Sequence, residues 1–462
     1  MDRRFQLRLE QLLADCHVPD NAFEDITQRL GDFVEPFLVS LPSPESRDHG
    51  HTYISGLLSD VARKNTESIA YRHEIDRQCL QRFIGYTEWD HKPLLDELTR
   101  QVAAEIGEAD AVIVFDPSAF AKRGTESVGV QRQWCGRLGK TENCQLGVYM
   151  GYVTRAEQVL VDERLYLPKE WTRKRLKKCG VPKEVKHQTR HELAVEMLSD
   201  RGSMLPHGWI AGDDEMGRPA WFREKLSEID ERYLLAVPSN MTVRDLEAVV
   251  PPQVRTGPGP GEKCGPRKAP FVSMASWCES QPADAWTRIV VRAADKGPIV
   301  VEAVKCRVEA KSERRVRGRE ELLFVTRQSL ADGNWRYDYH LSNASAETPL
   351  EELARVANAE HRIEQCFQRG KSEAGLADYQ TRSWWGWHHH QTRSMVARWF
   401  LVLETRRGKK GDAGADAASG ARGVIVDPAP RVWLRPAGAN HRGEEAAIEA
   451  QRAGAVLSLQ EA

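Results

Sequence analysis

Three acidic residues stand at positions where carboxylates could act together on metal ions. Asp116 follows the apolar run 111–115, which predicts a short buried strand, and Asp213 follows a second short strand predicted at 209–211. Glu364 lies within a segment of helical periodicity. Mg²⁺ prefers oxygen ligands, and two such ions about 4 Å apart can activate a water or hydroxyl and stabilise a leaving oxygen. An acid at a strand end is more often an ordinary surface residue, so metal-assisted phosphoryl transfer requires that the fold bring the three together.

A lysine accompanies the third acid. Lys371 follows Glu364 by seven residues, which is two helical turns, so the two side chains project from roughly the same face. A cation in that position could bind a phosphate group that lies over the carboxylates. We therefore expect Lys371 to contact the phosphate backbone of a nucleic acid.

The elements that would position these residues follow from the hydrophobic periodicity. Residues 1–105 show helical spacing and little strand signal, which predicts an all-helical N-terminal domain. Residues 106–240 run strand, hairpin, helix, strand, helix, strand, which predicts a mixed α/β sheet. The strands are expected at 111–115, 145–154, 159–166, 209–211 and 232–237, and the helices at 190–199 and 219–229.

In the second half of the chain, a β-rich segment follows the mixed α/β segment, and helices follow it. Residues 241–345 are dense in Pro and Gly and then contain four strand-like runs, which predicts a β-rich insertion. Helices resume at 346–405, where the Thr-Pro-Leu-Glu sequence at 348–351 has the capping pattern that starts a helix leading to Glu364. Residues 406–462 are rich in Ala and Gly without sustained periodicity, which predicts a low-complexity, poorly ordered tail.

Composition limits the class of protein. The 462 residues include 66 Lys plus Arg and 67 Asp plus Glu, a formal charge of −1 that excludes a small basic nucleic-acid module. No apolar run approaches the roughly 18 residues of a membrane span, and the N-terminus shows no export signal. The nine cysteines are scattered and form no Cys-x-x-Cys pair, which is typical of a reducing compartment. We expect a soluble cytoplasmic protein with no membrane partner.

Three blocks in chain order carry a family signature. The first is Phe115-Asp116-Pro117-Ser118, with Lys122, Gly124, Ser127-Val128-Gly129-Val130, Gln133-Trp134-Cys135-Gly136, Gly139-Lys140 and Asn143-Cys144-Gln145. The second is Gly212-Asp213-Asp214-Glu215-Met216-Gly217-Arg218. The third is Arg362-Ile363-Glu364, with Phe367, Lys371, Gly375-Leu376, Tyr379, Arg382-Ser383-Trp384 and Gly386-Trp387-His388. Together they resemble the DDE (Asp-Asp-Glu) transposases of bacterial insertion sequences, in particular the insertion sequence 701-like branch, from about residue 50 to about residue 403.

The resemblance implies a fold, a reaction and partners. The fold would be an RNase H-like mixed sheet with flanking helices, whose acids on the first strand, the fourth strand and a late helix match Asp116, Asp213 and Glu364. The reaction would be binding of the element's terminal inverted repeats, cleavage of its ends and joining of 3′-hydroxyls to target DNA, with Mg²⁺ or, as a substitute, Mn²⁺. The implied partners are double-stranded DNA and a second copy in a homodimer, in the bacterial cytoplasm at the nucleoid. The N-terminal helices would supply repeat recognition.

Positive charge is gathered where such a protein could hold DNA. Residues 1–60 carry a net charge of −6, whereas residues 169–190 carry +7 and residues 311–319 carry +4. Basic runs are usually solvated surfaces, and for the second cluster a solvated hairpin and a substrate clamp are equally compatible with the sequence. Beside an RNase H-like core we interpret both as surfaces for DNA phosphates. The candidate DNA-binding residues are Arg173, Lys174, Arg175, Lys177, Lys178, Arg314 and Arg315, together with Lys371.

Several alternatives stay open at this point. The second block contains adjacent acids, and the spacing to Gly217 favours Asp213 over Asp214. The atypical tail is compatible with a decayed or domesticated DNA-binding protein without turnover, and a structure-selective nuclease on the same fold is a third possibility. The run His388–His390 is interpreted as structural, because three adjacent helical residues point in three directions and cannot all bind one ion.

Overall fold

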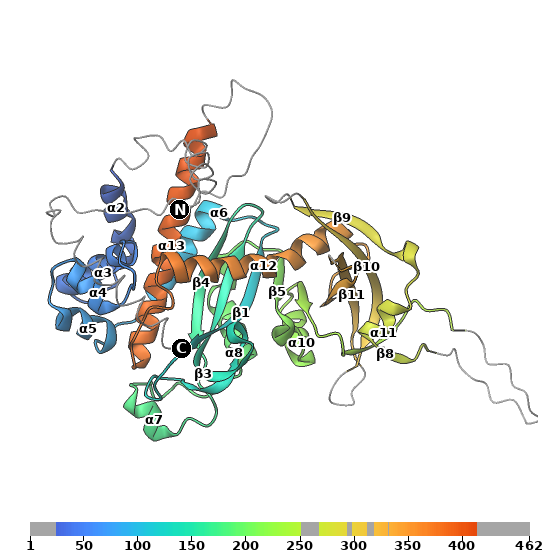
Figure 1. Ribbon diagram of the computed structural model, residues 1–462, viewed down its shortest axis with the longest axis horizontal. Coiled ribbons are helices and arrows are strands. Elements are labelled where there is room, and N and C mark those ends of the chain that lie inside the picture. The colour runs from blue at the N-terminus through green and yellow to red at the C-terminus, as the bar shows by residue number, and fades with distance from the viewer. Residues whose placement is uncertain (1–24, 251–267, 293–297, 312–317, 331, 414–462) are drawn as a thin grey trace, which may run out of the picture.

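The computed structural model describes residues 25–250, 268–292, 298–311, 318–330 and 332–413. This part of the chain folds as a mixed α/β protein around one twelve-stranded sheet. The N-terminal helices lie at one end, the β-rich segment lies at the other, and helix α12 crosses between them (Figure 1). Among the described residues, no helix is both long and apolar enough to cross a membrane.

Five strands form one end of the sheet. They are β1 (Val112–Ala121), β3 (Lys140–Val153), β4 (Gln158–Leu165), β5 (Trp209–Gly212) and β6 (Tyr233–Ala236). Strand β3 pairs antiparallel with both β1 and β4, whereas β5 lies parallel to β1 and β6 lies parallel to β5. The resulting order β4-β3-β1-β5-β6 is consistent with an RNase H-like fold, and the mixed α/β class is confirmed.

Shorter elements surround these strands. They are β2 (Gln131–Cys135) and the helices α7 (Arg173–Lys178), α8 (Arg190–Arg201), α9 (Asp214–Gly217), α10 (Ala220–Glu228) and α11 (Met274–Glu279). Helix α8 begins with a capping box in which the side chains of Thr189 and Glu192 satisfy each other's backbone N–H groups. Helix α8 packs on β3 and β4 and so covers part of the central sheet.

Strand β1 is longer than the sequence pattern predicts. We expected it to stop before Asp116-Pro117, but it continues to Ala121, so Asp116 lies inside the strand and not at its end. Proline is tolerated in a strand only where its missing N–H is not needed for pairing. That condition holds here because β5 pairs with β1 only up to Phe115, which leaves one edge of β1 without a partner strand from Asp116 onward.

The β-rich segment extends the same sheet. Strand β12 pairs antiparallel with β6, and β11 and β10 follow in order. Its strands are β7 (Thr242–Asp245), β8 (Phe271–Ser273), β9 (Thr287–Arg292), β10 (Ile299–Ala310), β11 (Glu320–Ser329) and β12 (Trp335–Ser342). One face buries a second apolar cluster that includes Val243, Trp277 and Leu341, whereas Leu322 and Phe324 on the other face join the main core.

The N-terminal helices share the main core. They are α2 (Ile26–Leu38), α3 (Pro44–Leu57), α4 (Thr66–Arg72), α5 (Arg77–Gly85) and α6 (Lys92–Ile106), and residues 1–24 lie outside the described part. Their buried side chains, such as Leu57 and Leu94, belong to the same apolar cluster as Val114 in β1. The described part of the segment is therefore helical as expected, but its core is continuous with that of the sheet.

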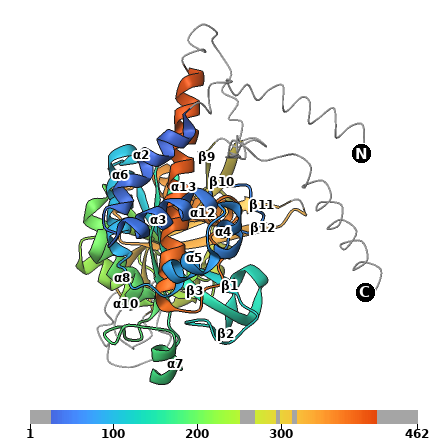
Figure 2. The same cartoon turned by 90° about the vertical axis from the view of Figure 1, so that its left-hand side faces the viewer.

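Two long helices complete the described structure. Helix α12 (Leu350–Glu373) begins near the expected place, but Pro349 and not Thr348 is its N-cap and no side chain caps it. The helix contacts β1, β3, β4, β5 and β6 as well as β9 and β10. Helix α13 (Trp384–Ala413) runs between the N-terminal helices and the sheet (Figure 2). It continues beyond residue 405, the expected end of the helical region, and residues 414–462 lie outside the described part.

Candidate active site

The register between β1 and β3 orients Asp116. Asp116 lies directly opposite Tyr149, so the two side chains project from the same face of the sheet. The ring of Tyr149 packs edge-on against Phe367 of α12, with ring centroids 5.1 Å apart. Asp116 therefore faces helix α12, the element that carries Glu364.

The parallel pairing of β1 and β5 brings the second acid beside the first. Phe115 is paired with Gly212, so Asp116 and Asp213 directly follow the last paired residues of two neighbouring strands. The side chain of Asp213 caps helix α9, where its Oδ1 accepts a hydrogen bond from the N–H of Met216 at 3.0 Å. Asp214, in contrast, is exposed and lies 3.9 Å from Arg218.

A close backbone contact explains the spacing between Asp213 and a glycine four residues later. The N–H of Gly217 donates to the carbonyl of Asp213 at 2.9 Å, which closes the single turn of α9. A Cβ atom on Gly217 would lie 1.9 Å from the carbonyl oxygen of Ala236 in β6. A side chain at position 217 would push this turn away from β6, so glycine is required there. The turn holds Asp213 at the end of β5.

A second close approach seats α12 on the sheet. A Cβ on Gly151 would lie 2.6 Å from the Cδ1 atom of Ile363 in α12. Gly151 and Tyr149 lie two residues apart on β3, hence on the same face as Asp116. Ile363 thus packs into the space left by the missing side chain of Gly151. This contact determines how close the neighbouring Glu364 lies to the sheet.

Helix α12 contributes a further carboxylate that the sequence reasoning missed. Glu360 lies one turn before Glu364 and is half-buried, whereas Glu364 is exposed. The i, i+4 spacing places both on one face of the helix, and this spacing was the signal available in the sequence. The candidate site is therefore a group of four acids: Asp116, Asp213, Glu360 and Glu364.

The charges of these acids act on one another. Burial raises the pKa of Asp116 well above its usual range, and the charges of Asp213, Glu360 and Glu364 raise it further, while Lys371 opposes them. Burial, then the charge of Asp213, raises the pKa of Glu360 to about 8. Burial also raises the pKa of Asp213 to about 7, against the hydrogen bond from Met216.

This donor set fits a divalent cation. Carboxylates crowded in a half-buried place must be neutralised either by protons or by bound cations. A set made only of carboxylate oxygens is typical of Mg²⁺ or Mn²⁺ binding and not of zinc binding. The residues present thus suit the metal that the sequence resemblance implies.

Lys371 lies at the edge of the acidic group. Its Nζ donates to the hydroxyl of Ser118 at 3.1 Å, and Ser118 stands two residues after Asp116 on the same face of β1. The ammonium also lies 5.2 Å from the ring centroid of Phe120 and 5.4 Å from that of Phe367. These contacts hold a positive charge beside Asp116.

The first basic cluster forms helix α7 at one end of the sheet. Arg175 donates to the carbonyl of Thr125 and lies over the ring of Trp171, and Lys178 pairs with Glu126. Because residues 122–130 follow directly from β1, these contacts hold α7 against the loop that leaves the strand of Asp116 (Figure 1). The remaining three cations, Arg173, Lys174 and Lys177, are exposed and form no ion pair within the described residues.

The second basic cluster lies largely outside the described structure. Arg314 and Arg315 fall within 312–317, which is outside the described residues, and Arg319 is exposed just before β11.

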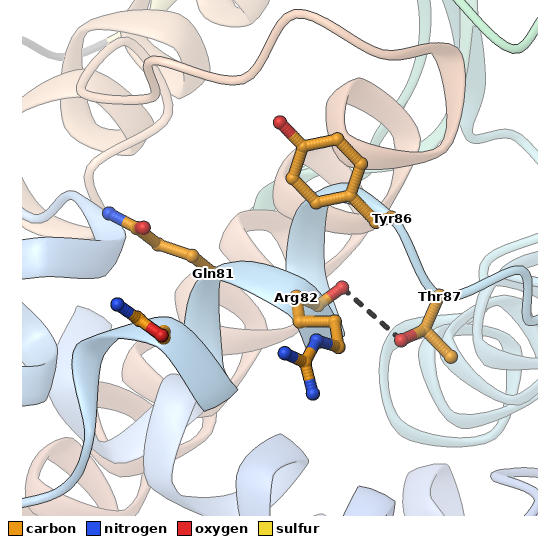
Figure 3. A pocket seen from close by; sticks show the side chains of 5 residues that line it. Gln81, Arg82, Tyr86 and Thr87 are labelled. Atoms are coloured by element: carbon orange, nitrogen blue, oxygen red, sulfur yellow. Dashed lines mark hydrogen bonds between the residues drawn. The ribbon is translucent and has the colours of Figure 1, made fainter.

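A surface depression lies on α5. It is lined by Gln78, Gln81, Arg82, Tyr86 and Thr87, and the Thr87 hydroxyl donates to the carbonyl of Arg82 at 3.2 Å (Figure 3). None of the four candidate acids lines it. Its amide and guanidinium groups are donors of the kind that contact phosphates and base edges.

Comparisons with known proteins identify the family of the chain. The family model described as DDE superfamily endonuclease matches residues 36–298. A protein of Microchaete diplosiphon, named probable transposase for insertion sequence element IS701, is 26% identical over 194 residues, which cover 41% of this chain and 49% of that protein. The chain thus spans about half the length of this relative. The family match confirms the kinship expected from the three sequence blocks, and the chain belongs to the DDE superfamily of endonucleases.

Proposed function

We propose that this protein is a DNA transposase that binds the terminal inverted repeats of its own element, cleaves the element ends and joins the 3′-hydroxyls to target DNA. The observation that carries the proposal is the group of half-buried and exposed acids at the β1–β5 junction under α12, within a DDE endonuclease chain. The name of the relative from Microchaete diplosiphon supports the same reaction.

Within this proposal each acid has a role. Asp116 and Asp213 would be shared between two metal ions, and Glu364 would complete one of the two sites. Bound Mg²⁺, with Mn²⁺ as a substitute, supplies activation of a water or 3′-hydroxyl and stabilisation of the leaving oxygen. Lys371, held by Ser118 beside Asp116, would position the scissile phosphate. Asp213 is preferred over Asp214 because its charge acts directly on Asp116, whereas Asp214 is exposed near Arg218.

The N-terminal helices are proposed to recognise the repeats. The depression on α5 offers Gln78, Arg82 and Tyr86 on an exposed surface, and these side chains can bind phosphates and base edges. Cleavage of two ends in one event implies that the working form is a homodimer.

The decisive experiment is incubation of the full chain with labelled DNA carrying the element's ends, an unlabelled target and Mg²⁺. We expect end-specific nicks and joined products. Binding without nicks would favour the alternative of a DNA-binding protein without turnover. Nicks that follow DNA shape and not the repeat sequence would favour a structure-selective nuclease.

Substitution of the two α12 glutamates tests which is the third catalytic acid. We expect Glu364→Gln to lower the cleavage rate on the order of 10³-fold, because its exposed carboxylate is accessible to ions and DNA. Glu360→Gln should cost less than about tenfold, because Glu360 is half-buried and close also to Asp338 of the β-rich segment. The two variants are matched in chemistry and lie one turn apart. A larger loss for Glu360→Gln than for Glu364→Gln would exchange the two assignments.

Neutralising the three unpaired cations of α7 tests its contact with DNA. The variant Arg173→Gln/Lys174→Gln/Lys177→Gln should bind end DNA more weakly and reduce the slope of log affinity against log salt by about 0.9 per lost phosphate contact. The charge-preserving variant Arg173→Lys/Lys174→Arg/Lys177→Arg is the control and should retain affinity. Filter binding from low to high salt measures both. An unchanged affinity and slope in the neutralised variant would remove α7 from the DNA surface.

A further inference from the structure

A second group of potential metal ligands lies away from the carboxylates. His91 precedes α6, Glu163 lies in β4 and His388 lies in the first turns of α13. All three are buried, with exposed fractions of 6%, 0% and 1%. One ligand atom from each residue lies within 4.8 Å of those from the other two. Three segments that are distant in sequence thus meet at this point.

These same three residues carry polar atoms that lack hydrogen bonds. Within the described residues, the Nδ1 atom of His91, the Oε2 atom of Glu163 and the Nε2 atom of His388 are buried without a partner. A buried polar atom without a partner is costly, and native proteins rarely leave several together. Each of the three residues thus keeps hydrogen-bonding or ligating capacity that the described protein groups do not use.

The arginines near the cluster form ion pairs with acids other than Glu163. The neighbouring Asp162 binds the guanidinium groups of both Arg164 and Arg201. Arg164 is further engaged by Glu196 and Asp200, so both arginines are already compensated. Among the described residues, the carboxylate of Glu163 contacts the Nδ1 atom of His388 at 2.9 Å and accepts a hydrogen bond from the hydroxyl of Thr392 at 3.3 Å. Within the part of the chain that the structure describes, no ion pair joins its carboxylate to an arginine, although the charges of Arg164 and Arg201 act on it.

The other two histidines of the His388–His390 run do not share this environment. The Nδ1 and Nε2 atoms of His389 contact the carbonyls of Ile84 and Trp89, both at 2.9 Å. His390 contacts Tyr53 at 2.8 Å and the carbonyl of Gly375 at 2.9 Å. Both rings are satisfied and structural, as the sequence analysis expected, and only His388 differs.

We propose that His91, Glu163 and His388 bind one zinc ion that fastens the N-terminal helices and α13 to the sheet. Two imidazoles and one carboxylate are a typical ligand set for Zn²⁺, whereas Mg²⁺ prefers oxygen ligands throughout. The rings of His91 and His388 stack with their centroids 4.4 Å apart and their planes at 17°, so one ring must turn for both to bind the same ion. This site is independent of the acids at β1, β5 and α12 and of the reaction proposed for them.

The first test measures bound metal in the full chain purified without added metal. We expect about one zinc per chain by inductively coupled plasma mass spectrometry. Glu163→Gln preserves the shape of the side chain and should lower the zinc content at least about tenfold. Two variants serve as controls and should keep their zinc. Asp116→Asn alters only the acidic group, and His207→Gln alters another histidine–glutamate pair, in which Nε2 lies 3.0 Å from Glu231.

A second test uses the wild-type chain alone, so that it remains informative if Glu163→Gln fails to fold. Replacement of the metal by Co²⁺ should produce the visible absorption bands of a four-coordinate site, and a chelator should lower the melting temperature by several degrees. Wild-type protein without bound transition metal, without a cobalt spectrum and without a response of its melting temperature to Zn²⁺ would overturn the proposal. That result would assign the three polar atoms to a buried water molecule.

Discussion

Asp116→Asn should abolish DNA cleavage and leave binding of the element ends intact. We expect the cleavage rate to fall on the order of 10³-fold or more, which is about 4 kcal/mol of barrier. The amide has the size of the carboxylate but lacks its negative charge, so it cannot hold a metal ion beside Asp213. A labelled-end cleavage assay measures the rate, and an electrophoretic mobility assay measures binding.

The same substitution should stabilise the metal-free protein at neutral to mildly alkaline pH. Burial and neighbouring carboxylates raise the pKa of Asp116 well above 3.8, so the folded state binds a proton more tightly than the unfolded state. The stability of metal-free wild-type protein should therefore fall as the pH rises from about 4 through the folded pKa. Asparagine removes this penalty, so the advantage of the variant should vanish near pH 4. A variant that cleaves well, or that is less stable than wild type at pH 8, would contradict the placement of Asp116.

Gly217→Ala should disable the enzyme through the backbone. The added Cβ would lie 1.9 Å from the carbonyl oxygen of Ala236, so the turn of α9 must move off β6 and take Asp213 with it. Overpacking of this kind costs about 1–3 kcal/mol of unfolding free energy. Cleavage should fall in parallel, because Asp213 leaves its place beside Asp116. Denaturant unfolding and the cleavage assay measure the two effects.

A helical glycine without neighbours provides the control for that substitution. A Cβ on Gly31 in α2 would meet no atom within 4 Å. Gly31→Ala should therefore stabilise the protein by about 0.5–1 kcal/mol, as expected for alanine replacing glycine within a helix. Equal stability and activity in Gly217→Ala and Gly31→Ala would show that α9 does not fix Asp213.

Much of the fold follows from local pattern. The runs that predicted strands at 145–154, 159–166 and 209–211 became β3, β4 and β5 within a few residues. Their apolar residues are buried on both faces, so the signal is strong over a short length. The apolar stripe of helix α12 also predicted the face that packs on the sheet, whereas the predicted Thr348 cap is wrong because Pro349 takes the N-cap position without a side-chain hydrogen bond.

The features of the fold that the local sequence pattern did not predict depend on contacts between segments that are distant in sequence. The length of β1 beyond Pro117 is set by β3, which continues to pair after β5 has ended. The continuous core of the N-terminal helices depends on α13, which begins 278 residues after α6 ends. Glu360 was overlooked because a half-buried acid on a helix resembles any surface glutamate until Asp116 and Asp213 are placed beside it.

The proposed site residues divide in the same way. Asp116, Asp213, Glu364 and Lys371 were chosen by type and spacing, and the structure brings the three acids and the lysine into one electrostatic group. Their catalytic roles stay predictions. The basic residues of α7 form two groups. Arg175 and Lys178 bind protein groups, whereas Arg173, Lys174 and Lys177 form no ion pair within the described residues.

Under the proposed function, helix α12 has a mechanical consequence for the candidate site. Its 24 residues form one rod of about 36 Å that touches the strands of both acidic residues at the β1–β5 junction and also touches β9 and β10. A rigid rod transmits torque, so a load applied to the β-rich segment is felt at Glu360 and Glu364. Tension in a DNA duplex that engages this segment would thereby be registered at the acids, without any chemical signal passing between them.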